Sequence, residues 1–198
     1  MNISVILGHP SLQSFNHAIA REAVAALQEN GHRVFYHDLY EEGFDPILWG
    51  ADAKGAVAPP GSDPMRQELT MSDGLIIVHP NWWGQPPAIV KGWVDRYISE
   101  RVAYLFPDED EGGGVPIGLF SDKRVLIFNT SNTPKQREKE VFGDPLQILW
   151  KHCIFDYCGV KTFHRRMFST IVNSTLEERR GWLQEVRETT GQFFPKQA

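Results

Sequence analysis

Short runs of apolar residues recur along the chain, and each is bounded by glycine, proline or small polar residues. Runs of this length with such boundaries are typical of buried strands rather than of helices. We therefore predict strands at Ile3–Leu7, Val34–Tyr36, Leu75–Val78, Lys123–Thr130 and Val160–Phe168. The first run is broken only by a serine, and such near-continuous apolar character favours a parallel sheet that is covered on both faces.

Between these strands, apolar residues return at the spacing of amphipathic helices. We predict helices over Ala18–Leu27, from Ser62 or Asp63 to about Met71, over Pro87–Tyr97, from about Asp144 to Tyr157, and from a Ser174–Glu177 capping box to about Gly191. Strands that alternate with helices predict an α/β fold with a doubly wound, five-stranded parallel sheet and helices on both faces. We expect a single domain, residues 1–198, with a hairpin or loop insertion around residues 100–122.

The stretch from Gly74 to Tyr97 combines a predicted strand, an aromatic loop and a predicted helix. The loop holds Trp82 and Trp83, and it leaves the carboxyl end of a strand, where open α/β sheets place their ligand crevice. Two adjacent indoles at this position are suited to a flat ligand. Packing against the neighbouring helix explains the pair equally well, because large aromatic side chains are commonly core residues or half-buried anchors.

The turn after the first strand, GHPSLQSFN, carries hydroxyl and amide side chains at Ser11, Gln13, Ser14 and Asn16. A helix follows directly, so its free N–H groups and its dipole make this turn a candidate phosphate site that needs no lysine. Helix capping by Ser14 or Asn16 is the alternative interpretation. The sequence contains neither G-x-G-x-x-G nor G-x-x-x-x-G-K-[ST], which argues against a classical dehydrogenase and a P-loop NTPase.

A third polar loop, Asn129–Asn132, follows the fourth predicted strand, and an ordinary surface loop is its alternative interpretation. Three such loops at the carboxyl ends of neighbouring strands would together fit flavin mononucleotide. The phosphate would lie at the first loop and the ring at the other two. A flavin supplies the redox chemistry itself, so this interpretation requires no catalytic acid or nucleophile from the chain.

The composition excludes some classes of protein. The chain has 198 residues and a net charge of -5, with 20 basic and 25 acidic residues, so it has no basic footprint for nucleic acid. It has no apolar run of membrane-spanning length, and its amino terminus has no basic region followed by an apolar one. We therefore expect a cytoplasmic protein without membrane insertion. Cys153 and Cys158 fit neither a zinc pair nor a C-x-x-C pair, and we expect two buried thiols.

Metal and hydrolase chemistry find little support in the sequence. His9 and His79 precede proline at adjacent strand ends, but no third ligand has a suitable spacing, so we expect no metal site. The sequence contains no G-x-S-x-G nucleophile elbow. We interpret the acidic run Asp108–Glu111 as a solvated turn rather than as a metal site.

Three segments, GHPSLQSFNHAIA, DLYEEGFDP and HPNWWGQPPAIVKGWVDR, resemble the flavodoxin-like NAD(P)H:quinone oxidoreductase family. That family includes the ancillary flavoproteins of bacterial potassium efflux systems. The resemblance, from Ile3 to about Phe168, implies the strand order 2-1-3-4-5, bound FMN or FAD, and two-electron reduction of quinones by NAD(P)H. It also implies a homodimer with the flavin at the interface. By this resemblance, the flavin would contact His9, Gln13, Ser14, Phe15 and Asn16 with its phosphate region, and Pro80, Asn81, Trp82, Trp83, Asn129, Thr130, Ser131 and Asn132 with its ring.

The sequence departs from this family after the fourth predicted strand. Many members have T-T-G-G there, followed by a tyrosine and a histidine that contact substrate and assist hydride transfer. This chain has NTSN and then TPKQREKEVFGD, with Phe142 where the histidine is expected. Ser131 and Asn132 bring side chains into space that glycine would leave open. Gly84 occupies a position that is aromatic in the family, which would widen or reshape the pocket.

Two hypotheses about function follow from the sequence. The first is a homodimeric flavoenzyme in which NAD(P)H reduces FMN, or alternatively FAD, which passes two electrons to a quinone or a similar electrophile. The shortness of the chain favours FMN. The second is a flavodoxin-like regulatory subunit of a membrane transporter or of another protein, with little catalysis of its own, and it is motivated by the altered NTSN segment.

Overall fold

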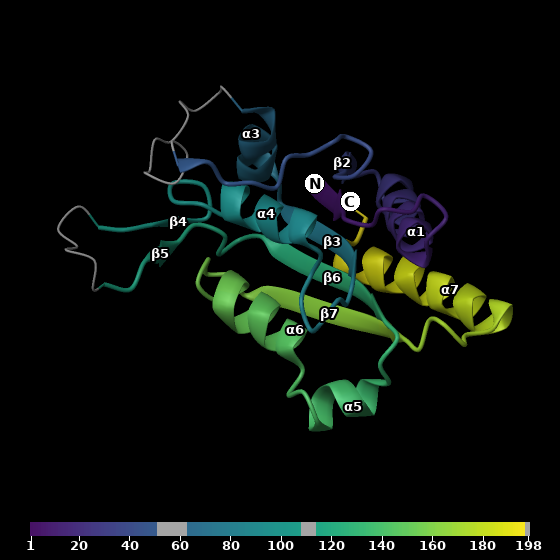
Figure 1. The fold of residues 1–198 in the computed structure, drawn as a ribbon. Coiled ribbons are helices and arrows are strands. Elements are labelled where there is room, and N and C mark those ends of the chain that lie inside the picture. Colours follow the sequence, from purple (N-terminus) through teal and green to yellow (C-terminus); the bar gives the residue numbers. More distant parts are fainter. Residues whose placement is uncertain (51–62, 108–113, 197–198) are drawn as a thin grey trace.

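The computed structural model describes residues 1–50, 63–107 and 114–196. Its main sheet consists of five parallel strands: β1 (Asn2–Leu7), β2 (Arg33–Asp38), β3 (Gly74–Pro80), β6 (Arg124–Ser131) and β7 (Thr162–Ser169). The strands lie in the order β2-β1-β3-β6-β7 (Figure 1). This order corresponds to 2-1-3-4-5, and the predicted doubly wound parallel sheet is confirmed.

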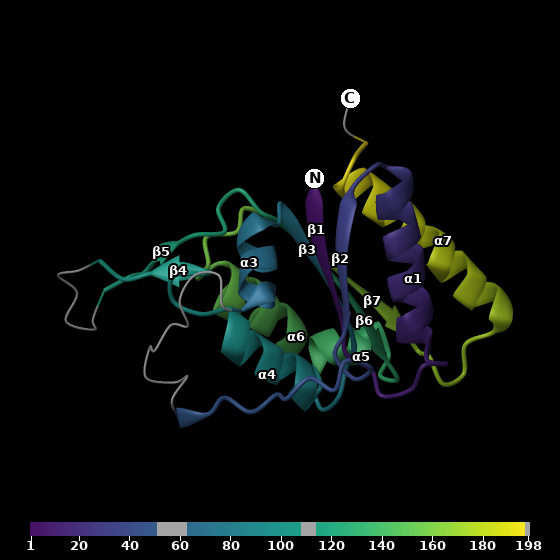
Figure 2. The ribbon, with the colours of Figure 1, turned by 90° about the horizontal axis from the view of Figure 1, so that it is seen from above.

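Helices cover both faces of the sheet (Figure 2). One face carries α1 (Phe15–Glu29) and α7 (Leu176–Phe193). The other face carries α3 (Pro64–Met71), α4 (Ala88–Tyr97), and α6 (Pro145–Gln147), which continues into the π-helical segment η1 (Ile148–Phe155). A short helix, α5 (Lys135–Glu140), lies beyond the carboxyl end of β6.

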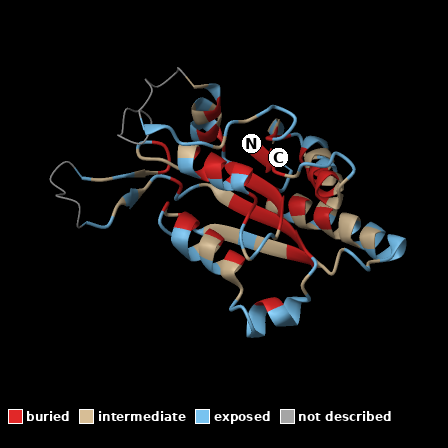
Figure 3. Ribbon diagram, viewed as in Figure 1, coloured by how far each residue is buried: buried red, intermediate tan, exposed pale blue. Residues whose placement is uncertain are grey.

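The core forms two layers because strand side chains alternate between the two faces of the sheet. In β3, which is buried along its whole length, Leu75 and Ile77 pack with α3, α4 and η1. Ile76 and Val78 pack instead with α1 and α7. Trp93 of α4 is fully buried within the first of these clusters. Figure 3 shows this central burial, with exposed residues concentrated on the outer helix faces and loops.

A pair of short strands lies beside the main sheet, where the sequence predicts a hairpin or loop insertion. The strands β4 (Tyr104–Leu105) and β5 (Ile117–Gly118) pair in antiparallel fashion. The acidic run Asp108–Glu111, interpreted as a solvated turn, lies outside the described residues, as does Ser62. Asp63 caps α3, because its carboxylate accepts a hydrogen bond from the backbone N–H of Met65 at 3.0 Å.

The predicted capping box of the last helix was wrong by one residue. Thr175, not Ser174, is the N-cap, and its backbone N–H donates to the Glu178 carboxylate at 2.7 Å while its hydroxyl accepts from the Glu178 N–H. Two S/T-x-x-E patterns overlap here, so the sequence alone does not distinguish them. The Ser174 hydroxyl instead donates to the Ile171 carbonyl at 2.7 Å.

Two further predictions failed around η1. A continuous α-helix from Asp144 to Tyr157 was expected, but the chain is α-helical only to Gln147 and then widens into the π-helical turn. Cys153, predicted to be buried, is exposed, whereas Cys158 is buried. A π-helical turn has an i→i+5 pattern, so a face assigned with 3.6-residue spacing no longer holds beyond it. Burial raises the pKa of the Cys158 thiol to about 12.

Candidate functional site

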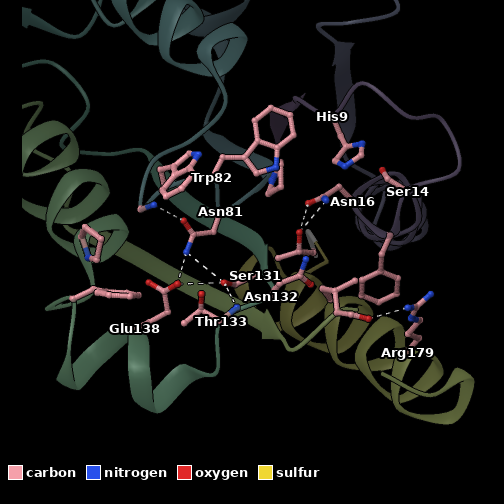
Figure 4. A pocket seen from close by; sticks show the side chains of 18 of the residues that line it. His9, Ser14, Asn16, Asn81, Trp82, Ser131, Asn132, Thr133, Glu138 and Arg179 are labelled. Atoms are coloured by element: carbon pink, nitrogen blue, oxygen red, sulfur yellow. Dashed lines mark hydrogen bonds between the residues drawn. The ribbon is translucent and has the colours of Figure 1, made fainter. Parts of the chain in front are cut away.

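A cavity of about 860 Å³ lies at the carboxyl ends of β1, β3, β6 and β7. The chain leaves β1 toward one face of the sheet and β3 toward the other, so the loops after these neighbouring strands diverge and leave a crevice. The cavity is lined by every site residue predicted from the sequence except Asn129: His9, Gln13, Ser14, Phe15, Asn16, Pro80, Asn81, Trp82, Trp83, Thr130, Ser131 and Asn132 (Figure 4).

One end of the cavity, which we call the helix end, is formed by Ser14, Phe15, Asn16 and Arg179. Ser14 caps α1, because its hydroxyl oxygen accepts from the His17 backbone N–H at 3.3 Å. Within the described part of the chain, the first two N–H groups of the helix, on Phe15 and Asn16, have no acceptor. Capping by Ser14 therefore leaves two N–H groups open at the same helix start, so the two interpretations of this turn are compatible.

Arg179 brings a positive charge to the helix end from the first turn of α7. Its Nη2 donates to the Ile171 carbonyl at 2.9 Å, and its Nε donates to the Ser174 hydroxyl at 2.8 Å. Its guanidinium lies 6.0 Å from the centre of the Phe15 ring. Among the described residues that line the cavity, it is the only lysine or arginine. The helix end thus combines free N–H groups with one fixed cation.

His9 borders the cavity with one ring nitrogen already engaged. Its Nδ1 accepts from the Ser11 backbone N–H at 3.0 Å. Burial lowers the pKa of His9, and a neutral ring with this contact carries its hydrogen on Nε2. The His9 ring also lies 6.3 Å from Trp82. His9 therefore has one N–H left for a ligand.

The opposite end, which we call the aromatic end, is formed by Asn81, Trp82, Trp83 and Glu138. Trp82 and Gln85 exchange two backbone hydrogen bonds of 3.0 Å around Trp83 and Gly84. Trp83 has φ 57° and Gly84 has φ 75°, the arrangement of a type I′ turn. Left-handed backbone at a tryptophan costs about 1 to 3 kcal/mol. The turn therefore holds Trp83, whose side chain is fully exposed, in an unfavourable conformation at the cavity mouth.

Asn81 joins three segments of the aromatic end. Its backbone N–H donates to the Thr130 carbonyl at 2.6 Å. Its side-chain oxygen accepts from the Gly84 N–H at 2.9 Å, and its Nδ2 donates to the Glu138 carboxylate at 2.7 Å. These contacts fix the orientation of the amide. Asn81 therefore links β6, the aromatic turn and α5 (Figure 4).

Glu138 is a buried carboxylate in the cavity wall, only 4% exposed. One oxygen accepts from Asn81 Nδ2 and from the Ser131 hydroxyl, the latter at 3.3 Å. Within the described residues, the other oxygen has no hydrogen-bond partner. Buried carboxylates are uncommon unless they are paired. The two ends of the cavity therefore carry charges of opposite sign, Arg179 at one and Glu138 at the other.

The side chains that replace glycine in the NTSN segment are held by neighbouring loops. The Ser131 hydroxyl donates to Glu138 and accepts from the Thr133 N–H at 3.0 Å. The Asn132 side-chain oxygen accepts from the Val172 N–H at 2.9 Å. Gly84 reshapes the cavity in a specific way, because a Cβ added there would lie 2.7 Å from Cγ of Pro145. Its lack of a side chain lets Pro145 approach the aromatic turn.

Asn129 and His79 lie beneath the cavity rather than in its wall. Asn129 is fully buried, and its side-chain oxygen accepts from Arg165 at 2.8 Å. His79 accepts from Trp150 Nε1 at 3.0 Å, and its Nδ1 donates to the Pro80 carbonyl at 2.8 Å. Burial lowers the pKa of His79 to about 4, so the ring is neutral. Both residues support the strand ends that carry the cavity.

Several lining residues were not among the sequence-predicted site: Gly84, Thr133, Glu138, Phe142, Pro145, Ile171 and Arg179. Ile171 and Arg179 follow the fifth strand of the sheet. The strand-end rule that identified the other loops was not applied to this strand, where it would have indicated the same edge of the sheet. Glu138 carried no such signal, because it belongs to a short, highly charged segment that normally forms a solvated face.

The described residues hold no group of three or more histidine, cysteine, aspartate or glutamate side chains that could bind a metal ion. In residues 1–50, 63–107 and 114–196, no helix is both long and apolar enough to cross a bilayer.

Comparison with known proteins places the chain among flavodoxin-like proteins. A family model described as "Flavodoxin-like fold" matches residues 1–189. A Haemophilus influenzae protein named "Uncharacterized NAD(P)H oxidoreductase" is 34% identical over 179 residues, which cover 86% of this chain and 85% of that protein. The rat "Ribosyldihydronicotinamide dehydrogenase [quinone]" is 26% identical over 213 residues, covering 93% of this chain and 90% of that one.

Solved structures of similar fold are also found. A Streptococcus mutans protein, Smu.1420, matches with a TM-score of 0.82 and 29% identity, over 97% of this chain and 100% of that one. The fold is also shared by an FMN-dependent NADH-azoreductase from Bacillus anthracis, solved in complex with FMN. It has a TM-score of 0.74 and 14% identity, over 97% of this chain and 99% of that one.

Proposed function

The chain belongs to the flavodoxin-like NAD(P)H:quinone oxidoreductase family, and from this premise we propose that its cavity holds a flavin and that it transfers two electrons from NAD(P)H to a quinone or a similar electrophile in the cytoplasm. The observation that carries the proposal is the cavity itself. It joins an open helix start to an aromatic turn across the topological switch point of the sheet. The overall reaction is NAD(P)H + H⁺ + quinone → NAD(P)⁺ + hydroquinone.

The residues present fit a flavin nucleotide. The free N–H groups of Phe15 and Asn16, with Arg179 beside them, suit a phosphate. Trp82, Trp83 and Pro80 offer apolar surface to a flat ring. Asn81 and Glu138 offer polar atoms to its edge. A volume of about 860 Å³ lies within the range of cofactor pockets. When bound, the flavin supplies the hydride and electron-transfer chemistry.

The chain's own residues then hold and orient the cofactor. The helix end binds the phosphate, while the hydrogen bonds of Asn81 keep the aromatic turn and α5 in place beside the ring. Trp83 and Phe142 stand exposed at the mouth, where the electron donor and the acceptor would enter in turn. We assign no proton-transferring residue to the reaction, because Phe142 has no titratable group where the family has a histidine.

We propose FMN as the flavin. FMN carries a single phosphate, and one helix start with one arginine is a site for one such group. The chain is also short. FAD is the alternative, and reconstitution with each flavin separates the two.

We also propose a homodimer in which the second copy closes the mouth of the cavity. Two exposed apolar side chains, Trp83 and Phe142, line the cavity there, and Val141, next to Phe142 in the chain, is exposed as well. Such a set on the rim of a site is typical of a surface that a partner covers. Sedimentation or light scattering would test this, and a monomer with full activity would contradict it.

The regulatory-subunit hypothesis is not retained. It was motivated by the NTSN segment, yet Thr130, Ser131 and Asn132 all line the cavity. The Haemophilus influenzae relative is named an oxidoreductase and the rat relative a dehydrogenase. No observation favours a transporter-bound role over an enzyme.

The test is a visible spectrum of the purified protein after incubation with FMN or FAD and removal of excess, followed by anaerobic addition of NADH or NADPH. We expect bound flavin peaks that bleach with one donor equivalent and return after one equivalent of a naphthoquinone. Protein that stays colourless with both flavins would contradict the proposed cofactor. Bound flavin that neither donor reduces would contradict the proposed reaction.

A further inference from the structure

Three side chains form a hydrogen-bonded row that begins in the cavity wall and runs into the protein. The Ser14 hydroxyl lies 2.9 Å from His17 Nδ1, and His17 Nε2 lies 2.7 Å from the Asp38 carboxylate. His17 is 5% exposed and Asp38 is 3% exposed, so water does not replace these contacts. The Asp38 carboxylate is held in turn by the backbone N–H of Tyr40 at 3.1 Å. The geometry of the row is therefore fixed at both ends.

The hydrogens of this row can be counted. Asp38, as a carboxylate, only accepts, so His17 Nε2 must carry a hydrogen. If His17 is neutral, its Nδ1 has no hydrogen and must accept from the Ser14 hydroxyl. The Ser14 oxygen already accepts the His17 backbone N–H as helix cap. A neutral His17 therefore uses the only hydrogen of Ser14 and leaves a lone pair of that oxygen toward the cavity.

A protonated His17 reverses this arrangement. Both ring nitrogens then donate, Nε2 to Asp38 and Nδ1 to the Ser14 oxygen. The Ser14 oxygen now accepts two hydrogen bonds, from Nδ1 and from the backbone N–H of the cap. Its own hydrogen is released and is directed to the cavity. Ser14 thus presents an acceptor to a ligand in one state and a donor in the other.

Phosphate oxygens only accept hydrogen bonds near neutral pH, so they require the donor state. On the basis of the proposed flavin site, we propose that His17 is a positioning residue. A ligand phosphate at the helix end draws one proton onto His17. The Ser14 hydroxyl then turns toward that phosphate. The imidazolium is then paired with the Asp38 carboxylate on one side and lies behind the phosphate site on the other. Phosphate binding and proton uptake are therefore coupled.

The other titratable groups around His17 do not provide the same switch. The His9 ring lies 6.2 Å away, but its Nδ1 already accepts from Ser11 and it donates from Nε2 without an added proton. On the outer side, Arg21, Tyr36 and Glu41 line a hollow together with His17 and Asp38. Arg21 and Glu41 carry opposite charges, so together they add no net charge beside His17.

The coupling has a clear sign. Because binding takes up a proton, affinity for the phosphate-bearing ligand increases as the pH falls. The increase is at most tenfold for each pH unit for one proton. It is expected between pH 8.5 and pH 7, where a phosphomonoester is mainly a dianion because its second pKa is about 6. Riboflavin has the same ring and no phosphate, so its affinity should not follow this trend.

Titration calorimetry at pH 8 tests the proposal. Binding of FMN, or of FAD if that is the flavin retained, is measured in two buffers of different ionisation enthalpy, neither of them phosphate, and riboflavin is the matched ligand. We expect uptake of about one proton with the nucleotide and of none with riboflavin. Nucleotide binding without proton uptake, or equal uptake with riboflavin, would overturn the role of His17 and leave the proposed function intact. Failure to bind any of these flavins would instead overturn the proposed function, and this inference with it.

Variants identify the proton's site. Ser14→Ala and His17→Gln should both abolish the uptake. Ser14→Ala leaves the pair of His17 and Asp38 in place, so it keeps the test valid if His17→Gln does not fold. His152→Gln is the control, since His152 is exposed and contacts Asp156 outside the cavity. It should bind FMN with the same uptake as the unaltered protein. Undiminished uptake in both Ser14→Ala and His17→Gln would refute the proposal.

Discussion

The helix end and the aromatic end of the cavity are built in different ways. At the helix end, Ser14, Phe15 and Asn16 belong to the start of a 15-residue helix that packs against the sheet, and Asn16 is buried and bonded to Thr130 at 3.0 Å. At the aromatic end, Trp83 is fully exposed on a turn with left-handed backbone. That turn is held by the side chain of Asn81 and, through it, by Glu138.

This difference indicates how each end achieves its precision. The helix end inherits its geometry from backbone that would be regular in any case, so its donors are aligned at little cost. The aromatic end consists of loops, and loops are positioned only by specific contacts. A buried carboxylate and a buried amide supply those contacts. Substitutions at the helix end should therefore alter ligand affinity more than stability, whereas those at the aromatic end should alter both.

The largest effect on ligand affinity is expected from Ser14→Asp. Aspartate is as good an N-cap as serine, so α1 should form normally. Its carboxylate would face the ligand phosphate, and two charges at close range near a protein surface repel by several kcal/mol. We expect FMN affinity to fall by about a hundredfold, with riboflavin affinity and thermal stability nearly unchanged. Fluorescence titration with both ligands measures this. Equal losses for the two would show that no phosphate lies near Ser14.

Glu138→Ala should affect both the fold and the ligand. The variant removes the acceptor for Asn81 and Ser131, and an unsatisfied buried donor costs about 1 to 3 kcal/mol. We expect about 2 kcal/mol less stability in urea unfolding and about tenfold weaker flavin binding. Glu138→Gln keeps an acceptor oxygen and should recover most of the stability.

The matched control for this substitution is Glu140→Ala. Glu140 lies on the same short helix and is exposed, and among the described residues its carboxylate hydrogen-bonds only with Gln136. It should change neither stability nor flavin affinity by a measurable amount. If Glu140→Ala matched Glu138→Ala, the aromatic end would depend on the helix α5 as a whole rather than on the buried carboxylate.

Trp83→Ala should weaken flavin binding by about tenfold. Stacking of a base on an aromatic side chain is worth about 1 to 3 kcal/mol, and we apply that scale to the flavin ring. Trp49→Ala is the control, because Trp49 is also exposed but does not line the cavity. Trp93→Ala should behave in the opposite way. It should lose about 3 to 5 kcal/mol of stability, and its flavin affinity should fall less than that of Trp83→Ala. Equal flavin affinity in folded Trp83→Ala and Trp93→Ala would refute the contact.

The smallest effect separates backbone strain from ring contact. Trp83→Gly and Trp83→Ala both remove the indole, but only glycine adopts φ 57° without steric cost. We expect the glycine variant to be more stable than the alanine variant by about 1 kcal/mol in thermal unfolding, with the same flavin affinity. Equal stability would mean that the turn relaxes to a different conformation once the indole is gone.

The parts of the site that sequence predicts are those governed by local rules. Buried strands, the polar turn after β1 and the aromatic loop after β3 follow from short patterns and from the placement of ligands at strand ends. Asn129 was included because it belongs to the same polar segment as Thr130. The alternation of side chains along a strand places the two on opposite faces, and the structure shows Thr130 in the cavity wall and Asn129 beneath it.

The parts that sequence does not predict depend on how distant segments meet. The buried carboxylate of Glu138 is hydrogen-bonded by Asn81, which lies 57 residues away in the chain. Asp144, the N-cap of α6, holds the segment after α5 through two 2.5 Å contacts to Arg165 of β7. The π-helical widening in η1 has no signal in the apolar spacing, which continues across it. These features require the tertiary structure, because no local propensity encodes them.

The positions of the lining residues along the chain also decide when the site can form during synthesis. The cavity wall includes His9 near the start of the chain and Arg179 in the first turn of the last helix. On the ribosome, a nascent chain that has not yet reached Arg179 cannot form the complete pocket. Loading of the proposed flavin therefore has to follow synthesis of the chain through Arg179. Until that point the chain lacks the stabilisation that a bound ligand would confer.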